Sequence, residues 1–196
     1  MICGIVLSAG QSRRMGEPKA LLRAGGETFL ARAVLALRQG GCDPVVVVTG
    51  PDEDAGARAI QAEARALGAS VAVNPDPRSE QLDSLRIGLR ALPDEAEGAA
   101  VSPVDIPDLS AGVVRRLVDA LRRTGAPIAV PVRDGKHGHP VLFGRAVFGE
   151  LSAPGLPDGA RTVIHAHAAE LAEVSVDALP ADLDTPEELR RWREGA

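Results

Sequence analysis

Short runs of apolar residues without polar alternation constrain the fold of this chain more than any other feature of its sequence. The clearest run is Val45-Val46-Val47-Val48-Thr49, in which β-branched residues follow one another without a break. Such a run is typical of a strand covered on both faces, as in the parallel sheets of α/β proteins. Further strands are expected at residues 1–7, 70–73, 99–104 and 128–132, with a shorter one at 141–143.

Helices are expected between these strands. Thr28 is a suitable N-cap for a helix whose apolar residues run from Phe29 to Leu37, and Ser110 for one that runs to Leu121. Other helices are expected at residues 55–67, 79–92 and 160–168, and a loop at 152–159. This alternation predicts a doubly wound α/β sheet. Residues beyond 133 are too few to bury a core alone, so they are expected to pack on the sheet within a single domain, 1–196.

Composition and charge argue against several classes of partner and site. The net charge is −5, aromatic residues make up 2% of the chain and Tyr is absent, so neither phosphate-driven nucleic-acid binding nor base stacking is expected. No apolar run approaches the roughly 20 residues that span a bilayer, and the first residues lack a signal-peptide pattern, so a cytoplasmic protein without membrane contact is expected. Cys3 and Cys42 form no CxxC pair and are expected to be small buried residues.

The first strand is followed by a loop of small and then basic residues, Ser8-Ala9-Gly10-Gln11-Ser12-Arg13-Arg14-Met15-Gly16-Glu17-Pro18-Lys19. Beyond a parallel strand, Gly10 and Gly16 would let backbone N–H groups approach a phosphate, and Arg14 and Lys19 would neutralise its charge. The spacing is neither that of a P-loop nor Gly-x-Gly-x-x-Gly. On these residues alone, a phosphate site and a solvated loop remain equally open.

The order of residues in this loop resembles the opening signature of MobA-like nucleotidyltransferases, with Ser8 where that family usually has Ala or Gly. Further matching segments follow in the family's order along the chain: Asn74-Pro75-Asp76, Ser84-Leu85-Arg86, Asp105-Ile106-Pro107, Gly138-His139-Pro140 and Leu183-Asp184-Thr185-Pro186. The chain is therefore identified as a member of this family. Ala9 and the Gly-His-Pro segment make it most similar to the molybdenum cofactor cytidylyltransferases.

The resemblance implies a three-layer, Rossmann-like fold of the nucleotide-diphospho-sugar transferase type, with a mostly parallel sheet and helices on both faces. It implies transfer of a nucleoside monophosphate from an NTP, with CTP favoured, to a phosphorylated acceptor such as molybdopterin, with release of pyrophosphate. Mg²⁺ is the implied cofactor, and a molybdoenzyme or its chaperone is the implied transient partner. Two alternatives remain: an enzyme of the same fold that uses a sugar or polyol phosphate, and a nucleotide-binding regulatory protein without turnover.

The resemblance also assigns roles to residues at matching positions. Arg14, Lys19 and Asp105 are the catalytic candidates, and the nucleotide-binding candidates are Leu7, Ala9, Gly10, Ser12, Arg14, Lys19, Asn74 and Ser84. His139 is the acceptor-binding candidate, whereas the other three histidines are expected to be ordinary polar residues.

Two carboxylates are the candidate metal ligands. Asp105 follows an expected strand, where open α/β sheets bind ligands, and a carboxylate is a hard ligand suited to Mg²⁺. Asp184 is the second candidate, with a helix N-cap as its alternative role. Glu80, Leu82 and Asp83 stand where the family commonly has glycine, which leaves the choice of nucleotide open.

Overall fold

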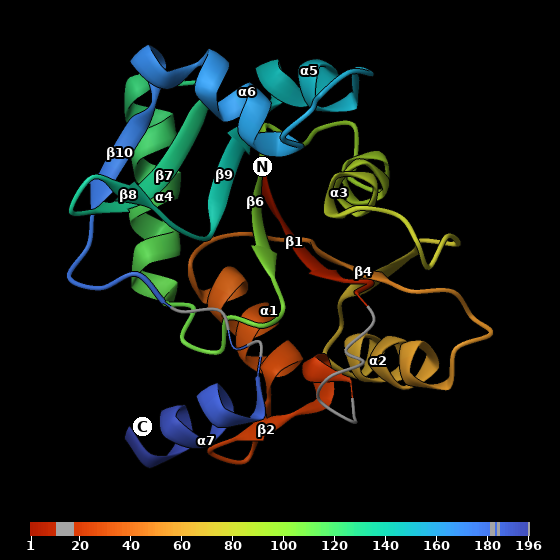
Figure 1. Cartoon of the computed structure of the whole chain (residues 1–196). Coiled ribbons are helices and arrows are strands. Elements are labelled where there is room, and N and C mark those ends of the chain that lie inside the picture. The colour runs from red at the N-terminus through yellow and green to blue at the C-terminus, as the bar shows by residue number, and fades with distance from the viewer. Residues whose placement is uncertain (11–17, 181–182, 184, 196) are drawn as a thin grey trace.

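A computed structural model of the chain describes residues 1–10, 18–180, 183 and 185–195 (Figure 1). The strands are β1 (Ile2–Ser8), β2 (Arg23–Ala24), β3 (Glu27–Thr28), β4 (Val45–Thr49), β5 (Ser70–Val73), β6 (Gly98–Pro103), β7 (Ile128–Arg133), β8 (Lys136–His137), β9 (Val141–Gly144) and β10 (Ala172–Ser175). The α-helices are α1 (Phe29–Gln39), α2 (Ala55–Ala66), α3 (Gln81–Arg90), α4 (Ala111–Thr124), α5 (Phe148–Ser152), α6 (Ala160–Ala166) and α7 (Pro186–Gly195). Three short 3₁₀ helices are η1 (Lys19–Leu21), η2 (Arg145–Val147) and η3 (Ala168–Glu170).

The main sheet has the strand order β10-β7-β9-β6-β1-β4-β5, and β8 pairs with β7. Strands β1, β4, β5 and β6 run parallel, whereas β9 lies antiparallel between β6 and β7. Strand β10 runs parallel to β7 at one edge of the sheet. The residues beyond 133 thus contribute the strands β8, β9 and β10 to the sheet itself, whereas the sequence predicted that they pack on it. Strands β2 and β3 form a separate small hairpin.

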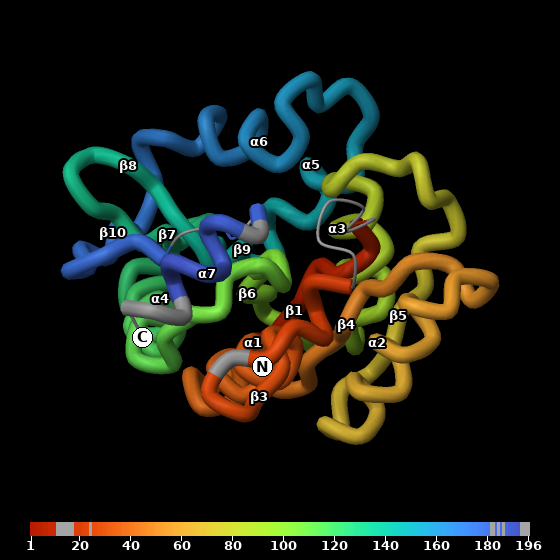
Figure 2. The backbone as a smooth tube through the Cα atoms, turned by 60° about the horizontal axis from the view of Figure 1, so that its bottom comes forward, coloured from red at the N-terminus to blue at the C-terminus, as the bar shows by residue number. Residues whose placement is uncertain are grey.

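Helices cover both faces of the sheet, which confirms the predicted three-layer arrangement. Figure 2 shows the strands crossing the middle of the molecule, with α5 and α6 on one side and α1, α2 and α4 on the other. Side chains alternate along β1, so that Ile2 and Val6 join one core and Ile5 and Leu7 the other. The helices that pack on the first core supply Leu30, Val34, Ile60, Val114 and Leu117, and those on the second supply Leu85, Leu89, Leu151 and Val163.

Helix ends agree with the local sequence signals. The Thr28 hydroxyl accepts a hydrogen bond from the Ala31 N–H at 3.0 Å, and the Ser110 hydroxyl accepts one from Val113, so both predicted N-caps are confirmed. Helix α7 has a capping box: the Thr185 hydroxyl accepts from the Glu188 N–H, and the Glu188 carboxylate accepts from the Thr185 N–H at 2.8 Å. Among the described residues Thr185 thus caps this helix, and Asp184 lies outside them.

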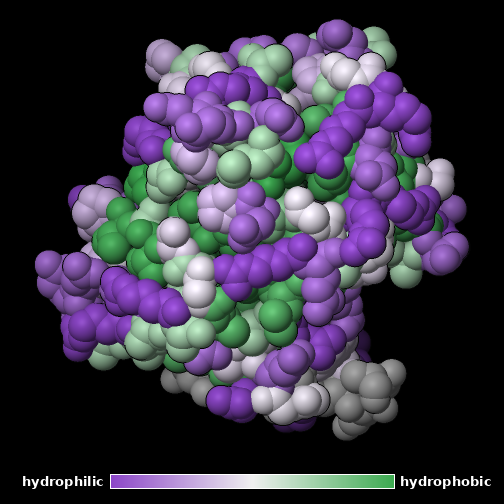
Figure 3. Space-filling view, turned by 180° about the vertical axis from the view of Figure 1, so that it is seen from behind, coloured by the Kyte–Doolittle hydropathy of each residue, from purple (hydrophilic) through white to green (hydrophobic). Residues whose placement is uncertain are grey.

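Helix α7 packs beside the β2–β3 hairpin (Figure 1) over a small third core, in which Trp192 lies against Leu22, Phe29, Leu183 and Leu189. Met1 is the only large apolar side chain among the described residues that is classed as exposed. Figure 3 shows polar and apolar residues interspersed over the back of the molecule. Within the described ranges, no helix is long and apolar enough to cross a membrane.

Candidate active site

The carboxyl ends of four parallel strands meet at one edge of the sheet. Ser8 of β1 is in register with Thr49 of β4, which in turn pairs with Val73 of β5. Backbone hydrogen bonds continue just beyond the paired residues. The Val104 N–H donates to the Leu7 carbonyl at 3.1 Å, and the Asn74 N–H donates to the Thr49 carbonyl at 2.8 Å. Candidate residues from three separate sequence segments therefore leave the sheet at the same edge, where α/β proteins bind ligands.

Lys19 and Asp105, which are 86 residues apart in the sequence, form an ion pair at this edge. The Lys19 ammonium lies 3.0 Å from Asp105 Oδ2, and the two side chains are 15% and 23% exposed. Lys19 begins η1, and the preceding Pro18 lies so close to α2 that a Cβ on Gly56 would be 2.8 Å from its ring. The end of the first loop is thus fixed by packing, which holds the Lys19 ammonium beside the turn after β6 that carries Asp105.

The second carboxylate oxygen of Asp105 lacks a hydrogen-bond donor among the described residues. Asp105 Oδ1 is buried and accepts no hydrogen bond from the described residues. Leaving a buried polar atom unsatisfied costs about 1–3 kcal/mol, and the cost is larger for a charged group. Oxygen is the ligand that Mg²⁺ prefers, and Mg²⁺ sites often use only one or two carboxylates together with phosphate and water. Asp105 therefore fits the predicted metal, although no group of three metal-ligating side chains lies among the described residues.

Several predicted residues complete or adjoin this edge. Leu7 and Ser8 are buried in β1, whereas Gly10 is exposed and a Cβ added there would meet no atom within 4 Å. Ser12, Arg14 and Asp184 lie outside the described residues. The neighbouring Leu183 is described, and its N–H donates to the Asp105 carbonyl at 3.0 Å.

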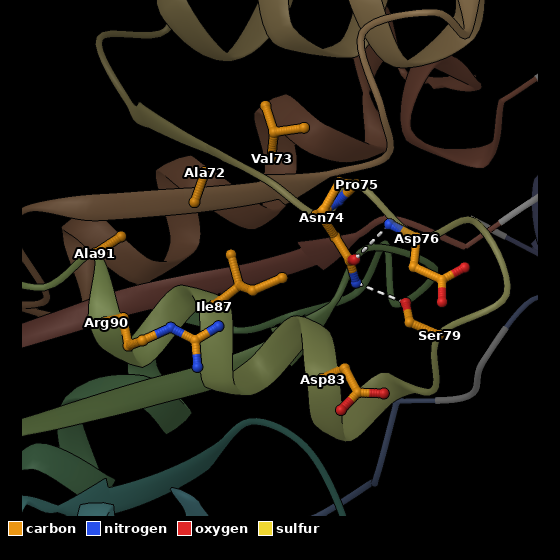
Figure 4. A pocket seen from close by; sticks show the side chains of 10 residues that line it. All are labelled: Ala72, Val73, Asn74, Pro75, Asp76, Ser79, Asp83, Ile87, Arg90 and Ala91. Carbon is orange, nitrogen blue, oxygen red and sulfur yellow. Dashed lines mark hydrogen bonds between the residues drawn. The ribbon is translucent and has the colours of Figure 1, made fainter.

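Asn74, which directly follows β5, and Ser84 of α3 are brought together in the interior. The Asn74 amide donates to Ser79 Oγ at 2.7 Å and to Ser84 Oγ at 2.9 Å, and its carbonyl accepts from the Asp76 N–H. Figure 4 shows Asn74, Asp76 and Ser79 converging beside a groove of about 550 Å³ that α3 borders. Asn74 is 2% and Ser84 is 5% exposed, so they shape this loop, and their contact with a nucleotide remains a prediction.

The residues that replace the family's glycines have structural roles in α3. Asp83 Oδ2 accepts from the Glu80 N–H at 3.2 Å at the start of the helix, and Leu82 is buried in the second core. Arg86, which belongs to one of the matching segments, donates to the backbone carbonyls of Leu151 and Ala153. These bonds join α3 to α5 and to the residue that follows α5.

His139 lines a cavity of about 330 Å³. Asp108 and Ser110 supply polar groups to the same cavity, and its apolar wall is formed by Val113, Pro131, Val176, Ala178, Leu179 and Pro180. The glycine of the Gly-His-Pro segment packs closely on this wall, because a Cβ on Gly138 would lie 2.5 Å from Leu179 Cδ2 and the Leu179 side chain would have to move. The sequence reasoning missed Asp108, although it directly follows Asp105-Ile106-Pro107.

His137 and His167 contact carboxylates other than Asp105, and both cysteines are buried. His137 Nε2 contacts the Glu173 carboxylate at 2.8 Å, and His167 lies between the carboxylates of Glu150 and Glu170. The hydrogen bond to Glu150 is the main cause that raises the pKa of His167, and Glu170 adds to it. Cys3 and Cys42 are buried thiols as expected, and burial raises the pKa of Cys42 to about 12.

The strand order, the covered faces and the charged groups at the carboxyl edge define an α/β protein of the Rossmann-like, nucleotide-diphospho-sugar transferase fold. The chain belongs to the family of the MobA-like NTP transferase domain, whose family model matches residues 4–172. The fold and the family both agree with the resemblance found in the sequence.

Individual relatives extend this result. A probable molybdenum cofactor guanylyltransferase from Mycobacterium avium is 36% identical over 66% of this chain and 62% of its own length, so the match spans less than two thirds of that relative. Nicotine blue oxidoreductase from Paenarthrobacter nicotinovorans is 30% identical over 97% of this chain and 95% of its own length. The crystal structure of Rv0371c from Mycobacterium tuberculosis H37Rv has a TM-score of 0.86 at 31% identity, with both chains fully covered. A second structure of Rv0371c is a complex with manganese (TM-score 0.81, 30% identity, covering 100% of this chain and 99% of that chain).

Proposed function

We propose that this chain is a divalent-metal-dependent nucleotidyltransferase, which transfers a nucleoside monophosphate from an NTP to a phosphorylated small molecule and releases pyrophosphate. The observation that carries this proposal is the Lys19–Asp105 pair at the carboxyl edge of the sheet, with one buried Asp105 oxygen that accepts no hydrogen bond from the described residues. A cation and an available hard oxygen, side by side, suit a polyanionic substrate that arrives with its metal.

The reaction requires little covalent chemistry from the protein. An oxygen of the acceptor phosphate attacks the α-phosphorus of the NTP, and the bond from that phosphorus to the oxygen bridging to the β-phosphate breaks. The acceptor phosphate is already a nucleophile, so the side chains need only orient the two substrates and stabilise charge. When bound, Mg²⁺ would offset negative charge on the phosphate oxygens, with Asp105 and Asp184 as its protein ligands.

Lys19 has two tasks in this proposal. Its ammonium orients the Asp105 carboxylate at 3.0 Å, which leaves Oδ1 for the metal. It also supplies positive charge near the triphosphate, together with Arg14. The nucleotide would lie close to the backbone of Leu7, Ala9, Gly10 and Ser12. Packing against the described residues does not explain the glycine at position 10, whereas close approach of a ligand to the backbone would.

The acceptor is proposed to occupy the cavity beside His139. Its apolar wall with a few polar groups is typical of a small-molecule site. Molybdopterin is the acceptor that the names of relatives support, and a sugar or polyol phosphate is the alternative. CTP is favoured by Ala9 and the Gly-His-Pro segment, whereas the guanylyltransferase relatives make GTP its main competitor.

The test is a panel of CTP, GTP, ATP and UTP with Mg²⁺, each with and without molybdopterin, with released pyrophosphate as the readout. Acceptor-dependent release with one NTP is expected, and it should stop on removal of divalent metal by a chelator. Because one relative is named an oxidoreductase, the same preparations are assayed for NADH oxidation with a dye acceptor. The proposal would be contradicted by NADH-dependent turnover in a protein that releases no pyrophosphate from any NTP, whichever acceptor is present, including sugar and polyol phosphates.

A further inference from the structure

The turn that follows Asp105 is held by an arginine from a distant helix. Arg32 of α1 donates from Nε to the Pro107 carbonyl at 2.7 Å, and its Nη2 lies 3.6 Å from Asp108 Oδ1. One guanidinium thus contacts the backbone of Pro107 and the side chain of Asp108. Ile106, which lies between Asp105 and Pro107, is buried in the first core, so the turn after Asp105 is fixed by packing as well as by Arg32.

Trp192 of α7 fixes the arginine in turn. The Arg32 guanidinium lies over the indole ring, 5.6 Å from its centroid, and the indole N–H donates to Asp108 Oδ2. The ring packs edge-on against Phe29 of α1, with the centroids 6.0 Å apart. Arg32, Asp108 and Trp192 therefore form a closed set of contacts, which we call the clamp. It joins α1, α7 and the turn after β6.

We propose that the clamp is a positioning device for Asp105: Arg32 and Trp192 hold the 105–108 turn so that the Asp105 carboxylate keeps its place beside Lys19 and can bind a divalent cation. Neither residue needs to touch a substrate. Asp108 also lines the cavity beside His139, so the same contacts fix the acceptor side of the site relative to the metal side. This inference rests on the proposed function, because it gives Asp105 the role of metal ligand.

The first test measures binding of Mn²⁺ alone, by the electron paramagnetic resonance signal of the free ion, in the full-length protein and its variants. Residues that orient a metal ligand typically change metal affinity or activity 10–100-fold when they are removed. We expect R32A and W192A to weaken Mn²⁺ binding by about 10-fold or more by this measure. The variant W192F keeps a ring on Arg32 and Phe29 but loses the N–H donor, so it should lie between wild type and W192A.

A second readout uses the fluorescence of Trp192 itself. The chain has one Trp and no Tyr, so intrinsic emission reports on the clamp alone. Titration of wild type with Mg²⁺, which does not quench fluorescence paramagnetically, should shift this emission, and R32A should remove the shift. In turnover assays R32A and R32K should lower kcat while changing the KM for the NTP less than about threefold, because the turn and not the loop before η1 is disturbed.

The matched control is R190A on the same helix. Among the described residues Arg190 pairs with Glu187 on the helix surface, and R190A should leave Mn²⁺ binding, the Mg²⁺-dependent emission shift and turnover as in wild type. D105A is the reference for loss of the metal ligand. If D105A weakens Mn²⁺ binding but R32A, R32K and W192F all bind and turn over as wild type, the clamp is wrong and the proposed function stands. If D105A also binds as wild type, or wild type binds no Mn²⁺, the metal role of Asp105 fails and the clamp fails with it.

Discussion

Substitution of Gly138 by alanine should separate acceptor binding from nucleotide binding. The added Cβ would lie 2.5 Å from Leu179 Cδ2 and 3.3 Å from Leu179 Cγ, so the Leu179 side chain must move. Leu179 lines the cavity with His139, and its displacement reshapes the wall of the proposed acceptor site. The KM for the acceptor should therefore rise, while the KM for the NTP stays as in wild type.

The size of the effect follows from the geometry of the clash. Overpacking of this kind costs about 1–3 kcal/mol, and the lower end applies because the clashing atoms are at the end of a flexible side chain. A loss of about 1 kcal/mol lowers the unfolding midpoint of a chain of this size by about 2–4 °C. Differential scanning calorimetry measures the shift, and initial rates at varied acceptor concentration measure the KM.

A double variant tests whether the contact with Leu179 causes the loss of stability. In G138A/L179A the methyl groups that clash are gone, so part of the lost stability should return relative to the sum of the two single variants. Additive losses of stability, or an increase in the KM for the NTP equal to that for the acceptor, would refute the role given to this contact.

Three further predictions concern other parts of the molecule. K19M removes the cation beside Asp105, and we expect turnover to fall by about 10²–10³-fold in a pyrophosphate-release assay, with K19R closer to wild type; unchanged turnover in K19M would contradict the role. The raised pKa of His167 means that its two carboxylate contacts contribute stability below its ordinary pKa of 6.5, and that this contribution is lost as the pH rises through the higher folded-state value; H167Q should therefore lower the unfolding midpoint at pH 6 more than at pH 9, and an equal loss at both would exclude the linkage. A Cβ on Gly88 would lie 2.8 Å from Ile5 Cγ2, so G88A should destabilise the protein by about 1–3 kcal/mol in urea titrations, whereas G149A, at an open position, should not.

The sequence predicted the elements whose signals are local and strong. The unalternated run at β4, the caps Thr28 and Ser110 and the helical spacing of α4 all lie where expected. Other elements were missed because tertiary contacts determine them. Strand β10 has an alternating burial pattern over only four residues, and it is defined by its pairing with β7. Helix α5 has five residues and lay just before an expected loop.

The candidate site was predictable in part for a similar reason. Strand ends at one edge of a parallel sheet come together by topology, so the order of the elements places Asp105 at the same edge as the first loop. The contact with Lys19 also depends on the packing of Pro18 against α2. The internal bonds of Asn74 and the carbonyl contacts of Arg86 do not, because they depend on how α3 and α5 pack. The clamp was also beyond sequence reasoning, since Arg32 and Trp192 are 160 positions apart and neither belongs to a motif.

The central claim is that the Lys19–Asp105 edge carries a metal-dependent nucleotidyl transfer. The most direct measurement incubates the protein with α-phosphate-labelled CTP or GTP, Mg²⁺ and molybdopterin, and follows the label by chromatography. The account predicts that the label moves to the acceptor in wild type and that D105A abolishes this transfer while its unfolding transition remains cooperative. Label transferred equally by folded D105A would contradict the account.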